Sequence, residues 1–212
     1  MSACYTPPPP FSARKLGWRH YGFERYDLYV HDTIGDGHCL LHTIMCGIHV
    51  PYRLGIKDGV YFDRSGEMRR IRDKMADSLE EMSTNDDIPH YFKIGDGALA
   101  EFGLTIPEFS LENVRNTLKS SSYLGNEHIV MISYFLNVGI YILDSSTQDI
   151  YYLDALPDST KSAVVALYSE KPVAHYELVS IKTDLEQKYI THFAPNHGFI
   201  EFLRVRMLSL KK

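Results

Sequence analysis

A cysteine that follows a glycine-rich loop is the residue in this chain best suited to nucleophilic chemistry. Gly35, Asp36 and Gly37 predict a tight turn just before Cys39. After it, apolar residues recur at helical spacing: Leu40, Leu41, Ile44, Met45 and Ile48. Unpaired N–H groups at a helix start favour a thiolate and can donate to an oxyanion. This stretch therefore predicts a nucleophile at Cys39 and an oxyanion hole formed by Asp36, Gly37, His38 and Cys39.

A histidine far along the chain offers the base that a nucleophilic thiol needs. His175 follows a buried strand and a Ser-Glu-Lys-Pro turn, and it opens the strand predicted at 176–181. A histidine at the start of a strand lies at the rim of a sheet, within reach of a helix N-terminus. Glu177 shares its face and could orient the imidazole. His192 is a rival base, but it lies in a predicted strand and has Ala194 two positions on.

Two other interpretations of the helix after the loop must be weighed. Cys39, His42, Cys46 and His49 recur at helical spacing and suggest zinc. Four successive positions on one straight helix span too far to surround one ion tetrahedrally, so we predict no metal site. Cys39 could also be a buried packing residue, as we expect for Cys46. Asp36 could simply cap the helix.

Two short motifs resemble the ovarian tumour (OTU) family of cysteine deubiquitinases. Residues 36–39 match its Asp-Gly-x-Cys signature, which precedes a hydrophobic helix. Residues 175–177 resemble the strand in which the family's histidine is followed by an aromatic residue and then usually Asp or Asn, although here the acid is Glu177. A helix–strand segment at 124–142 looks like the family's middle segment. The resemblance covers about residues 26–181 and implies one α+β domain of papain type, with a central sheet packed between helices.

The resemblance also implies an activity. Cys39 would attack the isopeptide bond after the C-terminal glycine of ubiquitin or a ubiquitin-like protein, with His175 as base, Glu177 as orienting acid and Asp36 in the oxyanion loop. No cofactor is implied, and the expected partner is ubiquitin, polyubiquitin or a ubiquitin-like modifier. The alternative is a catalytically silent ubiquitin-binding module of the same fold, against which the complete Cys, His and acid set argues. Compact OTU domains occur in viral and cellular proteins, and the sequence leaves that origin open.

An irregular segment between two predicted helices is either the expected grip on ubiquitin or merely a solvated loop with aromatic side chains packed beneath it. It spans about residues 84–109 and combines aromatic with acidic side chains, including Tyr91, Phe92, Asp86 and Asp87. Loops on a rigid scaffold often carry recognition. Acidic groups would suit the arginines of the ubiquitin tail, and aromatic groups its apolar patch. The OTU family also holds ubiquitin with a helical arm at about this place in the chain.

Composition limits the class of protein and its partners. The 212 residues suffice for one domain with a sizeable core. A balance of 22 Lys and Arg against 27 Asp and Glu gives a net charge of −5, which argues against nucleic acid or an anionic membrane as the main partner. Three cysteines do not suggest a disulfide framework, and we see no signal peptide. We therefore expect an intracellular, cytoplasmic protein, in the host cytoplasm if it is viral.

The domain boundaries follow from local composition. Residues 1–14, with four successive prolines, predict a flexible lead to a catalytic domain at 15–212. Ser65 is expected to cap a long amphipathic helix. A continuous apolar run at 138–143 predicts a central buried strand. A Pro-Asn-His-Gly turn predicts a C-terminal β-hairpin at 187–207.

Overall fold

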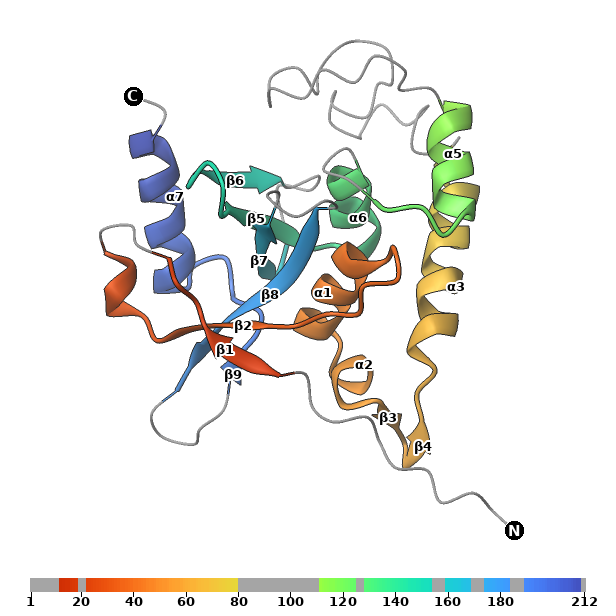
Figure 1. The fold of residues 1–212 in the computed structure, drawn as a ribbon, viewed down its shortest axis with the longest axis horizontal. Coiled ribbons are helices and arrows are strands. Elements are labelled where there is room, and N and C mark those ends of the chain that lie inside the picture. The colour runs from red at the N-terminus through yellow and green to blue at the C-terminus, as the bar shows by residue number, and fades with distance from the viewer. Residues whose placement is uncertain are drawn as a thin grey trace.

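A mixed β-sheet forms the centre of the molecule (Figure 1). The computed structural model describes residues 12–18, 22–79, 111–124, 128–153, 159–168, 174–183 and 189–210. Within these ranges the strand order is β1-β2-β8-β7-β5-β6, and β9 also pairs with β8. All neighbours are antiparallel except β5 and β7, which are parallel. The strands are β1 (Ala13–Lys15), β2 (Leu28–His31), β5 (Gly139–Asp144), β6 (Ile150–Leu153), β7 (Ser162–Tyr168), β8 (His175–Lys182) and β9 (Tyr189–Ile190).

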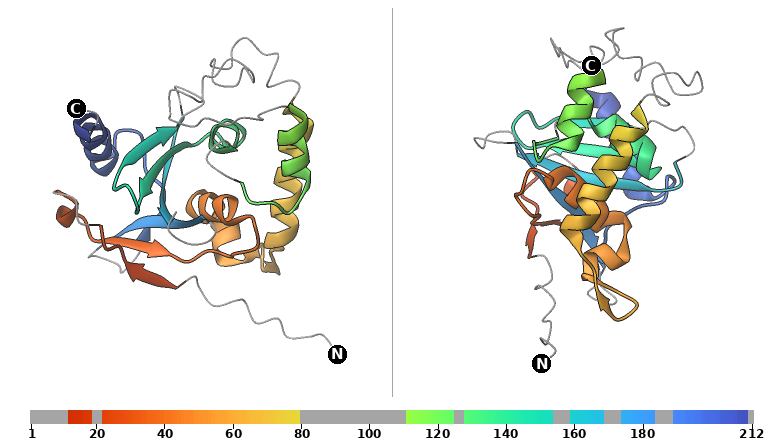
Figure 2. Two further views of the ribbon diagram at one scale, coloured as in Figure 1. Left: turned by 45° about the horizontal axis from the view of Figure 1, so that its top comes forward. Right: turned by 90° about the vertical axis from the view of Figure 1, so that its right-hand side faces the viewer.

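Helices cover both faces of this sheet (Figure 2). One apolar core joins one face to α1, α2, α3, α5 and α6, and a second core joins the other face to α7 and η1. A small separate hairpin, β3 (Ile56–Lys57) with β4 (Val60–Tyr61), lies between α2 and α3. The helices are α1 (Cys39–Ile48), α2 (Val50–Leu54), α3 (Arg64–Asp77), α5 (Leu111–Lys119), α6 (Ile129–Leu136), α7 (Gly198–Leu210) and the 3-10 helix η1 (Phe23–Arg25).

The buried strand predicted at 138–143 is β5, and every one of its residues is buried. A strand with helices over both faces needs apolar residues on both, and this explains its continuous rather than alternating pattern. The α+β class, with a central sheet between helices, is therefore confirmed.

The predicted C-terminal hairpin at 187–207 is wrong. Among the residues described there, 189–207, only Tyr189–Ile190 forms a strand, and the chain after the turn is the helix α7. Its buried residues are spaced as one stripe of a helix: Phe199, Ile200 and Leu203. The His197 carbonyl accepts from the Glu201 amide at 3.1 Å, and His197 Nδ1 accepts from the Phe199 amide at 3.2 Å. The Pro-Asn-His-Gly stretch thus begins a helix, because His197 satisfies amides of its first turn.

Two local expectations shift by a few residues. Asp63, not Ser65, caps α3, since its carboxylate accepts from the Gly66 amide at 2.9 Å. Strand β1 begins at Ala13, inside the segment predicted to be flexible, and pairs in register with β2. The Ser12 hydroxyl also donates to the Asp32 carboxylate. Residues 13–15 therefore belong to the sheet, and Ser12 is hydrogen-bonded to the chain after β2.

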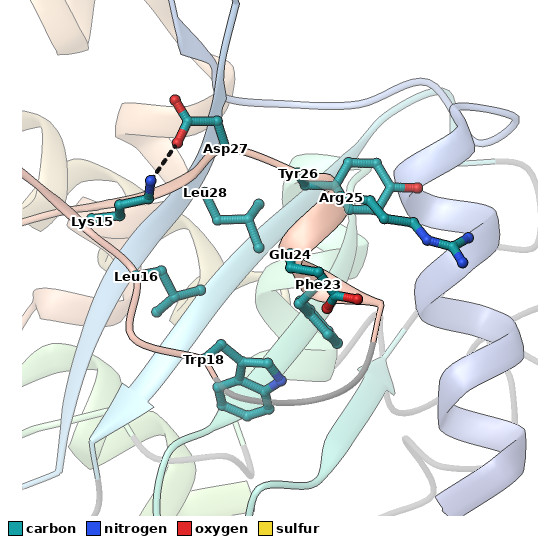
Figure 3. Close-up of a pocket in the computed structure, with 9 residues that line it drawn as sticks. All are labelled: Lys15, Leu16, Trp18, Phe23, Glu24, Arg25, Tyr26, Asp27 and Leu28. Atoms are coloured by element: carbon teal, nitrogen blue, oxygen red, sulfur yellow. Dashed lines mark ion pairs between the residues drawn. The ribbon is translucent and has the colours of Figure 1, made fainter.

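A hollow of about 640 Å³ lies where β1, η1 and β2 meet. Figure 3 shows its lining, which includes Trp18 and Phe23 and the ion pair between Lys15 and Asp27 at 3.2 Å. None of the residues that line it is a candidate for the chemistry described below. In the described ranges, no helix has the length and apolar character needed to cross a membrane.

Candidate active site

Cys39 is the first residue of α1, as predicted. The loop before it depends on Gly37, whose φ of +88° lies in the left-handed region. A Cβ at that position would lie 2.3 Å from the carbonyl oxygen of Ser121, which leaves no space for a side chain. Gly37 therefore lets the loop pass against the chain that follows α5.

Helix α1 and the chain before it are both hydrogen-bonded to Tyr176, near the beginning of β8. Its carbonyl accepts from the hydroxyls of Thr43 at 3.0 Å and Thr33 at 2.6 Å. Its backbone also hydrogen-bonds to the thiol of Cys39 and so favours the thiolate. The residue that follows His175 in the chain is thus in contact with the predicted nucleophile.

His175 and Glu177 lie on one face of β8, as the spacing predicted. His175 Nε2 is 3.9 Å from Glu177 Oε1, and the two side chains are 19% and 3% exposed. Because Nε2 faces the carboxylate, we assign proton exchange to Nδ1. The position of His175 at the sheet rim leaves the imidazole accessible.

The environment of Cys39 holds its thiol in the protonated form. Burial raises the pKa of Cys39, and the negative charge of Asp36 adds to this effect. Hydrogen bonds from the backbone of Tyr176, Leu40 and Cys39 lower the pKa again but do not outweigh burial. The helix start alone does not make a thiolate, contrary to the expectation from sequence, so the site needs a base.

This balance predicts how the thiol reacts with a small electrophile. A raised pKa means a smaller thiolate fraction at neutral pH. In a His175→Ala variant, the rate of Cys39 alkylation should therefore rise only at a pH above the ordinary thiol pKa. The wild type should already react at neutral pH. Iodoacetamide rates against pH, read on the Cys39 peptide by mass spectrometry, measure this. Equal rates for both proteins at neutral pH would show that another group removes the proton.

A buried histidine, His42, holds Asp36 in place by hydrogen bonds. His42 Nε2 donates to both carboxylate oxygens of Asp36, at 3.0 and 3.1 Å, and His42 Nδ1 accepts from the Tyr52 hydroxyl. Burial raises the pKa of Asp36, but its bonds to His42 and to the His38 amide outweigh this and hold the pKa below its usual range. Asp36 is therefore an ionised anchor for the loop.

His38 is fixed by a buried arginine. Arg72 Nη1 donates to His38 Nδ1 at 2.8 Å, so the ring proton of neutral His38 lies on Nε2. Burial and the Arg72 charge both lower the pKa of His38. Arg72 also donates to the carbonyls of Leu118 at 2.8 Å and Ser122 at 3.0 Å. One side chain thus joins the loop before Cys39 to the end of α5.

The predicted oxyanion hole is partly occupied by these contacts. The His38 amide donates to Asp36 Oδ1 at 3.0 Å, so it is engaged within the loop. The amides of Gly37 and Cys39 stay candidates for binding an oxyanion. Asp36 stiffens the loop but does not cap the helix, because the N-cap of α1 is His38 and no side chain caps it.

The rival base lies at the wrong end of α1. His192 Nδ1 donates to the Gly47 carbonyl at 3.1 Å. At 1.5 Å per residue, Gly47 is about 12 Å along the helix from Cys39. His192 therefore cannot take a proton from this thiol.

The remaining predictions concern Cys46, a metal site and the contacts with ubiquitin. Burial raises the pKa of Cys46 to about 12, so it is an inert packing residue. Across the described ranges, no group of three or more His, Cys, Asp or Glu residues could hold a metal ion. The predicted ubiquitin contacts, Tyr91, Phe92, Asp86 and Asp87, lie outside the described residues.

Sequence reasoning missed four residues that organise the site: Arg14, His42, Tyr52 and Arg72. His42 was considered only as a metal ligand. Arg72 carried a usable signal, because a charged residue on the buried stripe of a helix must find partners there. Arg14 carried none, because it follows a proline-rich stretch and binds a residue 163 positions away.

Comparisons with known proteins give one supported result. No protein-family model and no curated protein sequence matches this chain. A solved structure of an OTU domain in complex with ubiquitin is similar at TM-score 0.56 and 18% identity, covering 93% of this chain and 90% of that one. The Hazara virus OTU bound to ubiquitin has TM-score 0.43 and 12% identity, with 82% and 92% covered. The viral OTU domain protease from Dera Ghazi Khan virus has TM-score 0.43 and 10% identity, with 81% and 87% covered. The last two similarities are too weak to add to the assignment, which rests on the first: this chain has an OTU-like fold.

Proposed function

We propose that this protein is a cysteine-type hydrolase that cuts the isopeptide bond after the C-terminal glycine of ubiquitin or a ubiquitin-like protein. The nucleophile is Cys39, the base is His175, and Glu177 orients the base. The proposal needs no metal and no cofactor. We place the reaction in the reducing interior of a cell, where a free thiol persists.

The observation that carries this proposal is the contact between α1 and β8 at Tyr176. A nucleophilic cysteine needs a base within reach and a third group to orient that base. The Tyr176 backbone bonds to the Cys39 thiol, and His175 is the preceding residue. Tyr176 thus links the helix that carries the thiol to the strand that carries His175, which supports the pairing that we propose.

The first half of the reaction forms a thioester. His175 Nδ1 takes the Cys39 proton, and the thiolate attacks the glycine carbonyl of the modifier. The amides of Gly37 and Cys39 stabilise the oxyanion of the tetrahedral intermediate. When the C–N bond breaks, the imidazolium gives its proton to the lysine amine, which leaves.

The second half returns the enzyme to its starting state. A water molecule gives a proton to His175 as it attacks the thioester carbonyl, and the modifier leaves as a free carboxylate. The proton returns to Cys39. Glu177 stabilises the imidazolium that forms in both halves, because a carboxylate beside Nε2 favours the charged ring.

Ubiquitin is the favoured modifier because the OTU domain that shares this fold was solved in complex with ubiquitin. The test is a panel of ubiquitin and ubiquitin-like proteins that carry a C-terminal electrophile, incubated with wild type and with Cys39→Ala. A covalent mass shift with the wild type alone supports the proposal. Binding of ubiquitin without any adduct or turnover would instead identify the silent binding module.

The segment at 84–109 yields a separate prediction about the grip on ubiquitin. Tyr91→Ala, Phe92→Ala and the pair Asp86/Asp87→Asn should each lower kcat/KM for ubiquitin conjugates, by about 10-fold, through lost contacts with the apolar patch and the tail. A short peptide substrate lacks those contacts and should show little change. Steady-state kinetics on both substrates measure this. Folded variants with unchanged ubiquitin kinetics would place the grip elsewhere.

A further inference from the structure

Arg14 reaches the candidate site from the edge of the sheet. On β1 it is in register with Val30 of β2, and β2 pairs with β8. Its side chain therefore crosses β2 to reach β8, where Arg14 Nη2 lies 2.5 Å from Glu177 Oε2. The guanidinium also lies 5.4 Å from the ring centre of Tyr168 on β7. One edge residue thus contacts two of the strands nearest the site.

The carboxylate that it contacts is deeply buried. The Glu177 side chain is 3% exposed, and a buried charge is costly unless it is paired and hydrogen-bonded. The charged and titratable groups around it come from several elements. Arg14 comes from β1, Tyr168 from β7, His175 from its own strand, and Asp32 from the chain after β2.

These neighbours act on Glu177 in opposite directions. Burial raises the pKa of Tyr168, and the Glu177 charge raises it further, so this phenol stays neutral. The negative charge of Asp32 also raises the pKa of Tyr168. Arg14 is the cation in direct contact with the carboxylate and so favours its ionised form. Glu177 Oε2 is taken by Arg14, while Oε1 is the oxygen that faces His175.

We propose that Arg14 is a positioning residue that holds Glu177 ionised, with Oε1 directed at His175 Nε2. This rests on the proposed function, in which Glu177 orients the base. Glu has one more rotatable bond than the Asp or Asn usual in the resembling family, so it needs an external restraint. The contacts with Arg14 and Tyr168 supply that restraint.

The experiment compares Arg14→Ala and Arg14→Lys with the matched control Lys15→Ala. Lys15 is the next residue of β1 and loses only its exposed ion pair with Asp27 (Figure 3). Steady-state kinetics on a ubiquitin conjugate are measured across the pH range in which carboxylates and imidazoles titrate. We expect Arg14→Ala to lower kcat about 10- to 100-fold with little change in KM. Arg14→Lys should recover most of that loss, and Lys15→Ala should match the wild type.

The pH profile separates positioning from a merely structural role. Arg14 favours the charged form of the buried Glu177 carboxylate, and the active form needs Glu177 ionised. The acid limb of kcat/KM should therefore move to higher pH in Arg14→Ala, and Arg14→Lys should restore it. In a Glu177→Gln background, Arg14→Ala should add little further loss, because the charge that it holds is gone.

Three results would overturn the inference. Arg14→Ala could keep the wild-type kcat and pH profile. It could be faster than the wild type, which would mean that Arg14 competes with His175 for the carboxylate. The loss of activity in Arg14→Ala could add fully to the loss caused by Glu177→Gln. All three leave the proposed function standing as long as Cys39→Ala is inactive, whereas wild-type turnover by Cys39→Ala would overturn the proposed function itself.

Discussion

Cys39→Ala is expected to remove hydrolysis of ubiquitin conjugates, with a fall in kcat of at least about 10³-fold. Alanine has no group that can form the thioester, and no other cysteine among the described residues lies at a helix start. The fold should persist, because the substitution removes a single buried sulfur atom and costs about 1 kcal/mol. Turnover, ubiquitin binding and thermal unfolding of the same preparation measure the three effects separately.

Cys46→Ala is the matched control for this change. Cys46 lies about two turns further along α1, and it is buried like Cys39. Its removal should disturb packing to a similar extent and leave turnover near the wild-type rate. Turnover by Cys39→Ala close to wild type would refute the assignment of the nucleophile. A folded but inactive Cys46→Ala variant would favour the alternative in which α1 binds a metal ion.

His175→Ala should be nearly as damaging as loss of the thiol, with a fall in kcat of about 10³-fold or more. Because burial raises the pKa of Cys39, almost no thiolate forms at neutral pH once the base is gone. The kcat of Glu177→Gln should lie between those of His175→Ala and the wild type, since a misoriented imidazole still accepts protons some of the time. Single-turnover kinetics that follow the acyl-enzyme report directly on the step that needs the base.

His192→Ala is the control for the base. His192 donates to the Gly47 carbonyl at the far end of α1, so its removal should affect stability slightly and turnover little. If His192 were essential and His175 replaceable, the candidate site at the start of α1 would be wrong. Both variants carry the same change of side chain, which makes the comparison direct.

The parts of the site that the sequence predicts are those that depend on short-range patterns of residues. Gly37 before a helical run places a cysteine at the helix start, and the structure has Cys39 there. His175 at the beginning of a strand and Glu177 two positions on were likewise read from short-range periodicity. The family resemblance implied the α+β class with a central sheet between helices, and the continuous apolar run of β5 agrees with it.

The parts that it missed depend on contacts between distant residues. Arg14 and Arg72 act through partners that no periodicity connects to them. The thiol pKa was misjudged because burial depends on the whole fold, whereas the helix start is a local feature. The C-terminal error had another cause. Pro-Asn-His-Gly suits a hairpin turn and a helix start alike, and the spacing of Phe199, Ile200 and Leu203, which is helical, was the stronger signal.

The long chain separation between the contacts at β8 also has a consequence during synthesis. Arg14 and Glu177 are 163 positions apart, and β8 pairs with β2, which precedes Cys39. Such non-local pairings form late and slowly, because the entropy of closing a long loop is lost before any contact repays it. A ribosome-bound chain that lacks β8 carries an ordinary cysteine with no base beside it. On the proposed mechanism, the nascent protein therefore cannot hydrolyse its substrate until β8 has left the ribosome and paired.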